Sequence, residues 1–201
     1  MKMGFIAKDS GGQDFKKIPA GSYIARCYLL LDMGEQMTNG QYGEKIQYKI
    51  RLAWEVFGEE DDGTPLTVDV DGVMKPMTIG KTYTLSLSKK AGLRADLASW
   101  RGRDFTDQEL EGFDISDVLG AYCMLNITSS EKDGKKYTNI SAVTPLPKEF
   151  KNMKPEAVHE IVKFSLDEPD WDVFDNLPEW LRDTISKSPQ YAEQKAMDKG
   201  F

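Results

Sequence analysis

Apolar and polar side chains alternate most regularly between residues 45 and 56 of this chain. Successive side chains of a strand point to opposite faces, so the pattern predicts a long β-strand with one buried face. The face expected to be buried consists of Ile46, Tyr48, Ile50, Leu52, Trp54 and Val56. The opposite, exposed face then carries three cations, Lys45, Lys49 and Arg51.

Four more segments rich in β-branched and aromatic residues predict strands of the same sheet. They span residues 22–32, 78–87, 121–128 and 136–144. In the first of these strands, alternation places Ala25, Cys27 and Leu29 in the core. The same alternation turns Arg26 and Tyr28 outward, beside the exposed face of the long strand.

Turn and capping residues predict the shorter elements between these strands. Asp71-Gly72 is a two-residue turn signal, so residues 66–73 are expected to form an inserted hairpin. Ser88 precedes an apolar stripe at helical spacing and is the expected cap of a helix. That stripe consists of Leu93, Leu97 and Trp100. Thr106 and Glu109 form the pattern of a capping box, which predicts a second, shorter helix.

The order of these elements indicates a fold class. Three strands, a helical connection and two further strands are typical of the oligonucleotide-binding (OB) fold, a five-stranded barrel with a helix between strands 3 and 4. Other small β-barrels also carry a helix between strands, so the order alone leaves them open. We expect a mostly β protein with an OB-fold barrel and inserted hairpin in residues 1–150. A partly helical, acidic extension in residues 151–201 follows it.

The net charge of −7 argues at first against a nucleic-acid ligand, because affinity for phosphate comes chiefly from Lys and Arg. The acids are unevenly distributed, however. Residues 151–201 contribute −4 of the total, with 7 basic against 11 acidic residues, and residues 59–62 are four consecutive acids. The strands between these segments can therefore still present a basic face.

Exposed aromatic rings beside Lys and Arg are the usual surface for single-stranded nucleic acid. The rings stack on bases of any sequence, while the cations contact phosphates and make binding depend on salt. The cations expected to contact DNA are Arg26, Lys45, Lys49, Arg51, Lys81, Arg101, Arg103, Lys135 and Lys136. The rings expected to stack on bases are Tyr28, Tyr83, Tyr122 and Tyr137. Each tyrosine also fits a half-buried strand residue, and both Arg101 and Arg103 fit ion pairs with nearby aspartates.

Residues for catalysis or metal binding are sparse. His159 is the only histidine, and Cys27 and Cys123, the only cysteines, lie in separate apolar segments typical of buried thiols. This argues against a histidine-rich zinc site and against most hydrolase chemistry. A metal-dependent nuclease would need clustered acids on facing elements, whereas the acids here lie in loops. We expect a protein that is not an enzyme and has no metal and no cofactor.

Residues 93–106 form the string Leu-Arg-Ala-Asp-Leu-Ala-Ser-Trp-Arg-Gly-Arg-Asp-Phe-Thr. Shorter motifs around it are Gly21-Ser22-Tyr23, Trp54-Glu55, Glu109-Leu110, Gly112-Phe113-Asp114, Leu119-Gly120, Val143-Thr144-Pro145-Leu146-Pro147 and Leu177-Pro178-Glu179-Trp180, with Ser186 and Ser188. Over most of residues 18–190 the chain resembles the single-stranded DNA-binding proteins of phage and prophage replication modules. The resemblance implies an OB fold, sequence-independent binding of single-stranded DNA, and a role in phage DNA replication, recombination or repair.

The extension interleaves acidic and aromatic side chains. Such a segment is either a solvated, disordered stretch or a surface that docks on another protein, and its large aromatic residues favour docking. The residues expected to bind replication or recombination proteins are Asp170, Trp171, Asp172, Phe174, Asp175 and Trp180. Removing residues 165–201 is then expected to preserve or raise affinity for DNA, because it removes acids that compete with phosphate.

Location and assembly are expectations of a more general kind. No run approaches the roughly 20 apolar residues of a membrane helix, and residues 1–5 lack the apolar core of a secretory signal. We expect a protein of the bacterial host cytoplasm, a monomer or homodimer, that does not bind membranes. The alternative function is a phage adaptor or host-modulating protein that uses the same barrel to bind protein, which the net charge supports.

Overall fold

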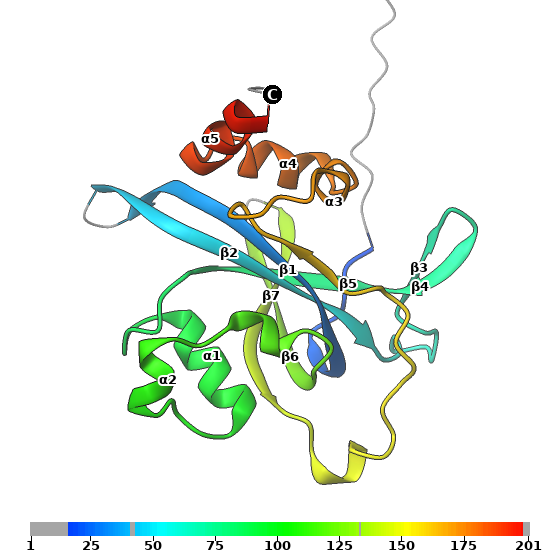
Figure 1. The fold of residues 1–201 in the computed structure, drawn as a ribbon. Helices are drawn as coiled ribbons and strands as arrows, with labels where there is room; N and C mark the ends of the chain where they lie inside the picture. The colour runs from blue at the N-terminus through cyan, green and yellow to red at the C-terminus, as the bar shows by residue number, and fades with distance from the viewer. Residues whose placement is uncertain (1–15, 41–42, 133, 199–201) are drawn as a thin grey trace, which may run out of the picture.

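The computed structural model describes residues 16–40, 43–132 and 134–198, without the side chains of residues 132, 135 and 136. The protein is mostly β, and its main sheet has six strands (Figure 1). They are β1 (Gly21–Gly40), β2 (Gly43–Phe57), β5 (Thr78–Thr84), β6 (Tyr122–Lys132), β7 (Lys135–Pro145) and β8 (Val162–Phe164). The five strands expected from the sequence are all present, although β1 runs on well beyond its expected end.

The strand order is β5-β2-β1-β6-β7, all antiparallel, and β8 pairs in parallel with β1. Within the described residues no ladder joins the edge strands β5 and β7, so the sheet is open and the expected barrel is not shown. The two edges are linked by a hydrogen bond of 3.5 Å from Lys81 Nζ to the carbonyl of Ile140.

The shorter elements lie largely where turn and capping residues predict them. β3 (Thr67–Val70) and β4 (Val73–Pro76) form the inserted hairpin as a separate two-stranded sheet. Between β5 and β6 come α1 (Gly92–Arg101), α2 (Asp107–Glu111) and the 3-10 helix η1 (Ile115–Val118). The capping box of Thr106 and Glu109 at α2 is confirmed. Ser88 does not cap α1, because the helix begins later, with Ala91 at its N-cap.

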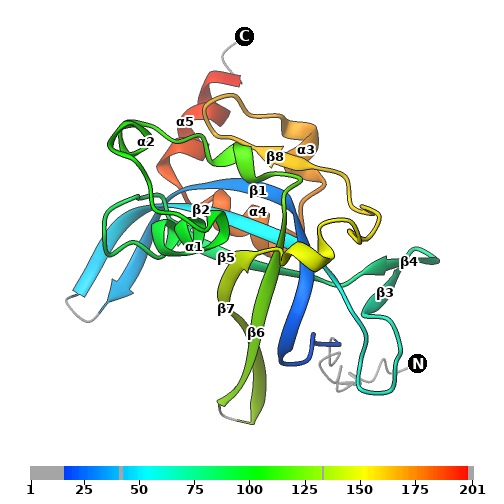
Figure 2. The ribbon, with the colours of Figure 1, turned by 90° about the horizontal axis from the view of Figure 1, so that it is seen from below.

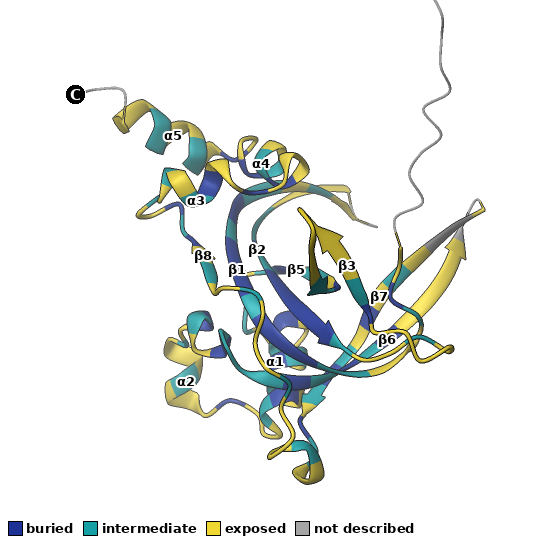
Figure 3. Ribbon diagram, turned by 90° about the vertical axis from the view of Figure 1, so that its right-hand side faces the viewer, coloured by how far each residue is buried: buried dark blue, intermediate teal, exposed yellow. Residues whose placement is uncertain are grey.

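The main core lies between one face of the sheet and α1. Leu93, Leu97 and Trp100 of α1 are buried there, as their spacing predicts. On β2, Ile50, Leu52, Trp54 and Val56 are buried as expected, whereas Tyr48 is half-buried and Ile46 is 66% exposed. The reason is that pairing with β5 reaches only to Lys49, so the far part of the β1–β2 hairpin extends beyond the core (Figure 3).

Strand β1 contributes side chains to two different cores because of a β-bulge. Its register with β2 shifts between Cys27 and Leu29, where one extra residue reverses the alternation of faces. Ala25, Cys27 and Leu30 consequently face the main core. The prediction that Leu29 joins them is wrong, because Leu29 lies in the second core with Leu31 and Met33.

The C-terminal extension builds this second core on the opposite face of β1 from α1 (Figures 1 and 2). After the 3-10 turn η2 (Lys148–Phe150) and strand β8, it forms α3 (Trp171–Asp175), α4 (Glu179–Ile185) and α5 (Pro189–Asp198). The buried residues of the second core are Leu29, Leu31, Met33, Ala53, Phe164, Leu166, Phe174, Leu177, Leu181 and Ile185. None of the described helices is long and apolar enough to cross a membrane.

Glycine at position 34 allows this close packing. Gly34 has φ of +64°, a left-handed conformation that favours glycine, at the second register shift of β1. A Cβ added there would lie 2.5 Å from the Cβ of Ser188, which follows α4. The backbone of β1 can therefore approach the extension only where the side chain is absent.

Candidate nucleic-acid interface

The outward face of β2 carries two cations that rest on β5. Lys49 donates to Gln47 Oε1 and to Thr84 Oγ1, both at 2.8 Å. Arg51 donates to Thr82 Oγ1 at 3.1 Å. Lys49 lies opposite Thr84 and Arg51 opposite Thr82 in the strand register. We call Lys49 and Arg51, with the neutral oxygen atoms that hold them, the cationic ladder.

Neither cation of the ladder has a carboxylate partner among the described residues. Burial lowers the pKa of Lys49 and the pKa of Arg51 from their ordinary values, as expected of cations that have lost water without gaining an anion. An anion placed beside them restores the lost interaction energy. The ladder is therefore suited to a phosphate group.

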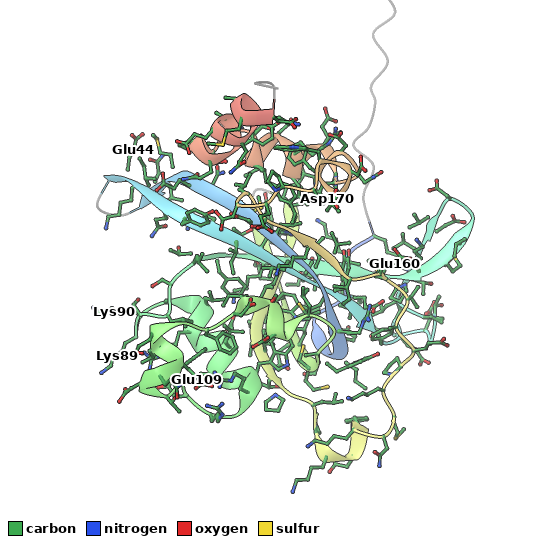
Figure 4. All side chains as sticks on the ribbon, in the orientation of Figure 1. Glu44, Lys89, Lys90, Glu109, Glu160 and Asp170 are labelled. Atoms are coloured by element: carbon green, nitrogen blue, oxygen red, sulfur yellow. The ribbon has the colours of Figure 1, made fainter. Side chains whose placement is uncertain are left out.

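A groove of about 420 Å³ continues from the ladder between β2, β5 and the start of α1. None of the described residues that line it is acidic. Its polar lining consists of Gln47, Lys49, Lys81, Thr82, Tyr83, Thr84, Ser86, Ser88 and Lys90. Lys89 and Lys90 lie on the same side of the molecule as Glu44 near the tip of the β1–β2 hairpin (Figure 4). Besides Lys49, the cations that line the groove are Lys81, which shares its charge with Asp96, and Lys90.

Lys81 and Tyr83 are less available than the sequence suggests. Lys81 pairs with Asp96 of α1 at 2.6 Å, and a third of its side chain is exposed. Tyr83 is only 4% exposed and donates to Asp96 at 2.7 Å. Burial and the neighbouring carboxylate raise the pKa of Tyr83. The prediction of an exposed ring at Tyr83 is wrong because Tyr83 points into the core, while Lys81 stays a candidate with a shared charge.

Arg26 and Tyr28 are covered by the segment that precedes β8. Arg26 is 8% exposed and bonds Glu55 at 2.5 Å and the carbonyl of His159. The ring of Tyr28 packs on the ring of His159, with centroids 4.8 Å apart. The prediction that both side chains lie on an open surface is wrong, because the chain returns over this part of β1.

Arg101 and Arg103 converge on one carboxylate. Both pair with Glu109, Arg103 at 2.7 Å. The guanidinium of Arg101 also lies 4.5 Å from the ring centroid of Phe105 and is largely covered. Arg103 keeps about half of its side chain exposed, at 55%. These contacts favour the ion-pair alternative for Arg101, although the partner is Glu109 and not one of the expected aspartates. Arg103 also pairs with Glu109 and is not among the residues that line the groove.

The remaining candidates lie in several places. Tyr122 is half-buried and donates to the carbonyl of Pro155 at 2.6 Å, which indicates a structural role. Tyr137 is 47% exposed on the β6–β7 hairpin, and its ring remains a candidate. The side chains of Lys135 and Lys136 lie outside the described residues. Lys45 is exposed near the tip of the β1–β2 hairpin.

The aromatic residues of the extension have separate positions. Phe174 is 4% exposed in the second core, and Trp171 packs edge-on against it at 5.7 Å between ring centroids. The prediction that Phe174 is free for a partner is wrong, because it fills the space above β1. Trp180 is 54% exposed and lies 4.8 Å from the guanidinium carbon of Arg51.

Of the acids predicted to bind a partner, one has a structural role and two are simply exposed. Asp170 caps α3 by accepting from the amides of Asp172 and Val173. Asp172 and Asp175 are exposed, so their role in partner binding stays a prediction. Asp170 is exposed as well, but its capping of α3 is a structural role that explains an aspartate at this position without a partner.

Sequence reasoning missed the β5 residues that support the ladder. Gly80, Thr82 and Thr84 share the outward face of β5, whereas Lys81 and Tyr83 belong to the other face. Alternation within residues 78–84 predicts that Gly80, Thr82 and Thr84 share one face, and cross-strand pairing then places the threonines beside cations of the neighbouring strand.

Comparison with known proteins assigns no family to the chain. No model of a protein family matches it, and no curated protein is similar to it at a significant level. Within the described residues, no three His, Cys, Asp or Glu side chains are grouped so that they could hold a metal ion. Function is therefore inferred from the geometry of the sheet face and the groove.

Proposed function

We propose that this protein binds single-stranded DNA without sequence preference, along the cationic ladder and the groove beside it. The observation that carries the proposal is the pair Lys49 and Arg51, held in place by neutral acceptors and without a carboxylate among the described residues. Two partly desolvated cations on the outward face of the sheet favour an anionic polymer over a neutral ligand. Lys81 and Lys90 continue the path into the groove.

The strand order supports an assignment to the OB class. The third, second, first, fourth and fifth main strands are neighbours in that order, as in an OB barrel that is opened between its third and fifth strands. In that fold the face of strands two and three and the adjoining loops bind oligonucleotides, and here those strands are β2 and β5. With the resemblance to phage proteins, we place the activity in phage DNA replication, recombination or repair.

The first test is fluorescence anisotropy of a labelled oligo(dT) at low and at moderate salt, with a duplex of equal length as competitor. We expect tight binding of oligo(dT) that weakens steeply as the salt concentration rises, and we expect that the duplex does not displace the single strand. Absence of binding at low salt would overturn it.

Replacing both cations of the ladder, Lys49→Ala with Arg51→Ala, is expected to weaken binding by about tenfold for each cation removed. The slope of log K against log salt should flatten by roughly 0.7 for each phosphate contact on a single strand. The matched control is Lys148→Ala with Lys151→Ala, which removes two cations around η2, the yellow turn at the bottom of Figure 1. Equal affinity of the two double variants would show that the interface lies elsewhere.

One observation favours the alternative of a protein adaptor. The β3–β4 hairpin exposes Val73 at 55% and Met74 at 59%, beside the less exposed Val68 and Val70. Neighbouring apolar side chains that remain in water often mark a site for another protein. This alternative becomes the leading one if oligo(dT) does not bind at low salt.

A further inference from the structure

We propose that Trp180 stacks on a nucleobase, so that the C-terminal extension completes the DNA interface. The inference rests on the proposed function and adds a ligand contact, a base, to the phosphate contacts of the cationic ladder. It also gives Trp180 a role different from the partner binding that its sequence context suggests.

Trp180 differs from the other tryptophans of the chain in its exposure. Trp54 is fully buried and Trp100 is 8% exposed, both in the main core, while Trp171 packs among aromatic rings of the second core. Trp180 is 54% exposed although the helix that carries it is firmly anchored. The anchors are Leu181 and Ile185, which are 4% and 0% exposed. A rigid backbone therefore presents an open indole to solvent.

The indole lies directly at the cationic ladder. The Arg51 guanidinium is 4.8 Å from the ring centroid of Trp180. On β5, a Cβ at Gly80 would lie 2.5 Å from a terminal nitrogen of Arg51, so the guanidinium fits against the strand only because residue 80 is glycine. Arg51 thus connects the sheet face, through Gly80 and Thr82, to the extension, through Trp180.

The charges around Trp180 favour a phosphate at the cationic ladder and a base at the indole. Glu179 is exposed on α4 next to Trp180, and Asp183 lies one helical turn further on, so both carboxylates would repel a phosphate there. Lys49 and Arg51 on β2 would attract it. A strand that lies with its phosphates along the ladder can turn a base toward α4, where the face of the indole that Arg51 does not cover offers a stacking surface. Cations along the backbone and a ring beneath the base are the combination found in single-strand binding grooves.

The test measures tryptophan fluorescence and oligo(dT) affinity of the full chain. Trp54 and Trp100 are buried in the main core, and Trp171 is half-buried against the second core under Lys195, so quenching by DNA that is lost in Trp180→Ala reports on Trp180. Trp180→Ala is expected to lower affinity by about 5- to 150-fold, the effect of losing one stacked base, and to abolish most of the quenching. Trp180→Phe should retain most of the affinity. Met74→Ala, an exposed apolar residue on the β3–β4 hairpin, is the matched control and should bind like the wild type.

A strand that carries abasic sites in place of its bases separates stacking from a change of fold. On this strand, wild type and Trp180→Ala should bind equally, because only phosphate contacts remain. If wild type binds oligo(dT) but Trp180→Ala binds it as tightly and quenching persists, the inference fails while the proposed function stands. If wild type does not bind oligo(dT) at all, the proposed function fails and the inference fails with it.

Discussion

Replacing Glu55 with alanine is expected to lower the free energy of unfolding by about 3–5 kcal/mol, because it leaves the charge of Arg26 buried without a partner. Glu55 is completely buried. Its Oε1 accepts from Arg26 at 2.5 Å, and its Oε2 accepts from the amides of Val158 and His159 at 3.2 and 3.0 Å. Urea denaturation followed by circular dichroism measures the loss.

A double-mutant cycle separates the pair from its surroundings. Arg26→Ala should cost a similar amount, and the two replacements together should cost clearly less than the sum of the single ones. A loss below about 1 kcal/mol for either single variant would contradict the role of this pair as a fixed point between β1 and the segment before β8. Surface pairs such as Arg103 with Glu109 serve as the comparison, since exposed ion pairs contribute little.

The same carboxylate gives stability a defined dependence on pH. Burial alone raises the pKa of Glu55, but hydrogen bonds from His159, Arg26 and Val158 outweigh burial and bring the pKa below its ordinary value of 4.5. The folded state therefore holds this proton less tightly than the unfolded state. Its contribution to stability is complete above about pH 4.5 and is lost as the pH falls through the folded pKa. Glu55→Gln isolates the effect, because its stability difference from wild type should shrink between about pH 6 and about pH 3.

Deleting residues 162–201 is expected to leave a chain that does not fold. The deletion removes β8 and α3 to α5 and exposes the part of the second core that belongs to the sheet, including Leu29, Leu31 and Met33. Phe164, 2% exposed, gives a scale, since truncation of a buried phenylalanine to alanine costs about 3–5 kcal/mol. The sequence predicts instead that removing residues 165–201 preserves or raises affinity for DNA, but that deletion also removes buried residues of the second core, from Leu166 to Ile185.

A shorter truncation is the matched control for that deletion. Ending the chain at Ser188 removes α5, which contains no buried residue among those described, and should cost far less stability. Thermal denaturation of Phe164→Ala and of both truncated chains measures the differences. A cooperative transition near the wild-type temperature after removal of residues 162–201 would show that the extension is dispensable for folding.

The alternation of residues 45–56 and the capping box of Thr106 identify elements correctly because each depends only on neighbours in the chain. The second core depends on contacts between residues far apart in the sequence. The many acidic residues of the extension favoured a solvated segment over a packed one. One local pattern did indicate the second core: Leu29-Leu30-Leu31 is a continuous apolar run, whereas a strand with one solvent-exposed face alternates apolar and polar residues. Such a run indicates burial on both faces.

Only part of the candidate site could be predicted from the sequence, because alternation along a strand does not show which later segment covers it. Lys49 and Arg51 follow from the exposed phase of the long strand, and the structure keeps them at the surface, partly covered. Arg26 and Glu55 belong to the same outward faces of β1 and β2, yet they are buried because residues 158 and 159 return over them. A polar residue on an outward face thus indicates solvent only where no later segment covers the strand.

The position of β8 beside β1 bears on how the chain folds during synthesis. Arg26 and its contact at His159 are 133 residues apart, and Leu29 pairs with Val162. At about 5–20 residues per second, the ribosome delivers these partners many seconds after β1 has emerged. Until then Leu29, Leu31 and Met33 face water on a nascent chain. High contact order of this kind slows folding, so the incomplete sheet is the stage at which the protein is most exposed to aggregation and to chaperones.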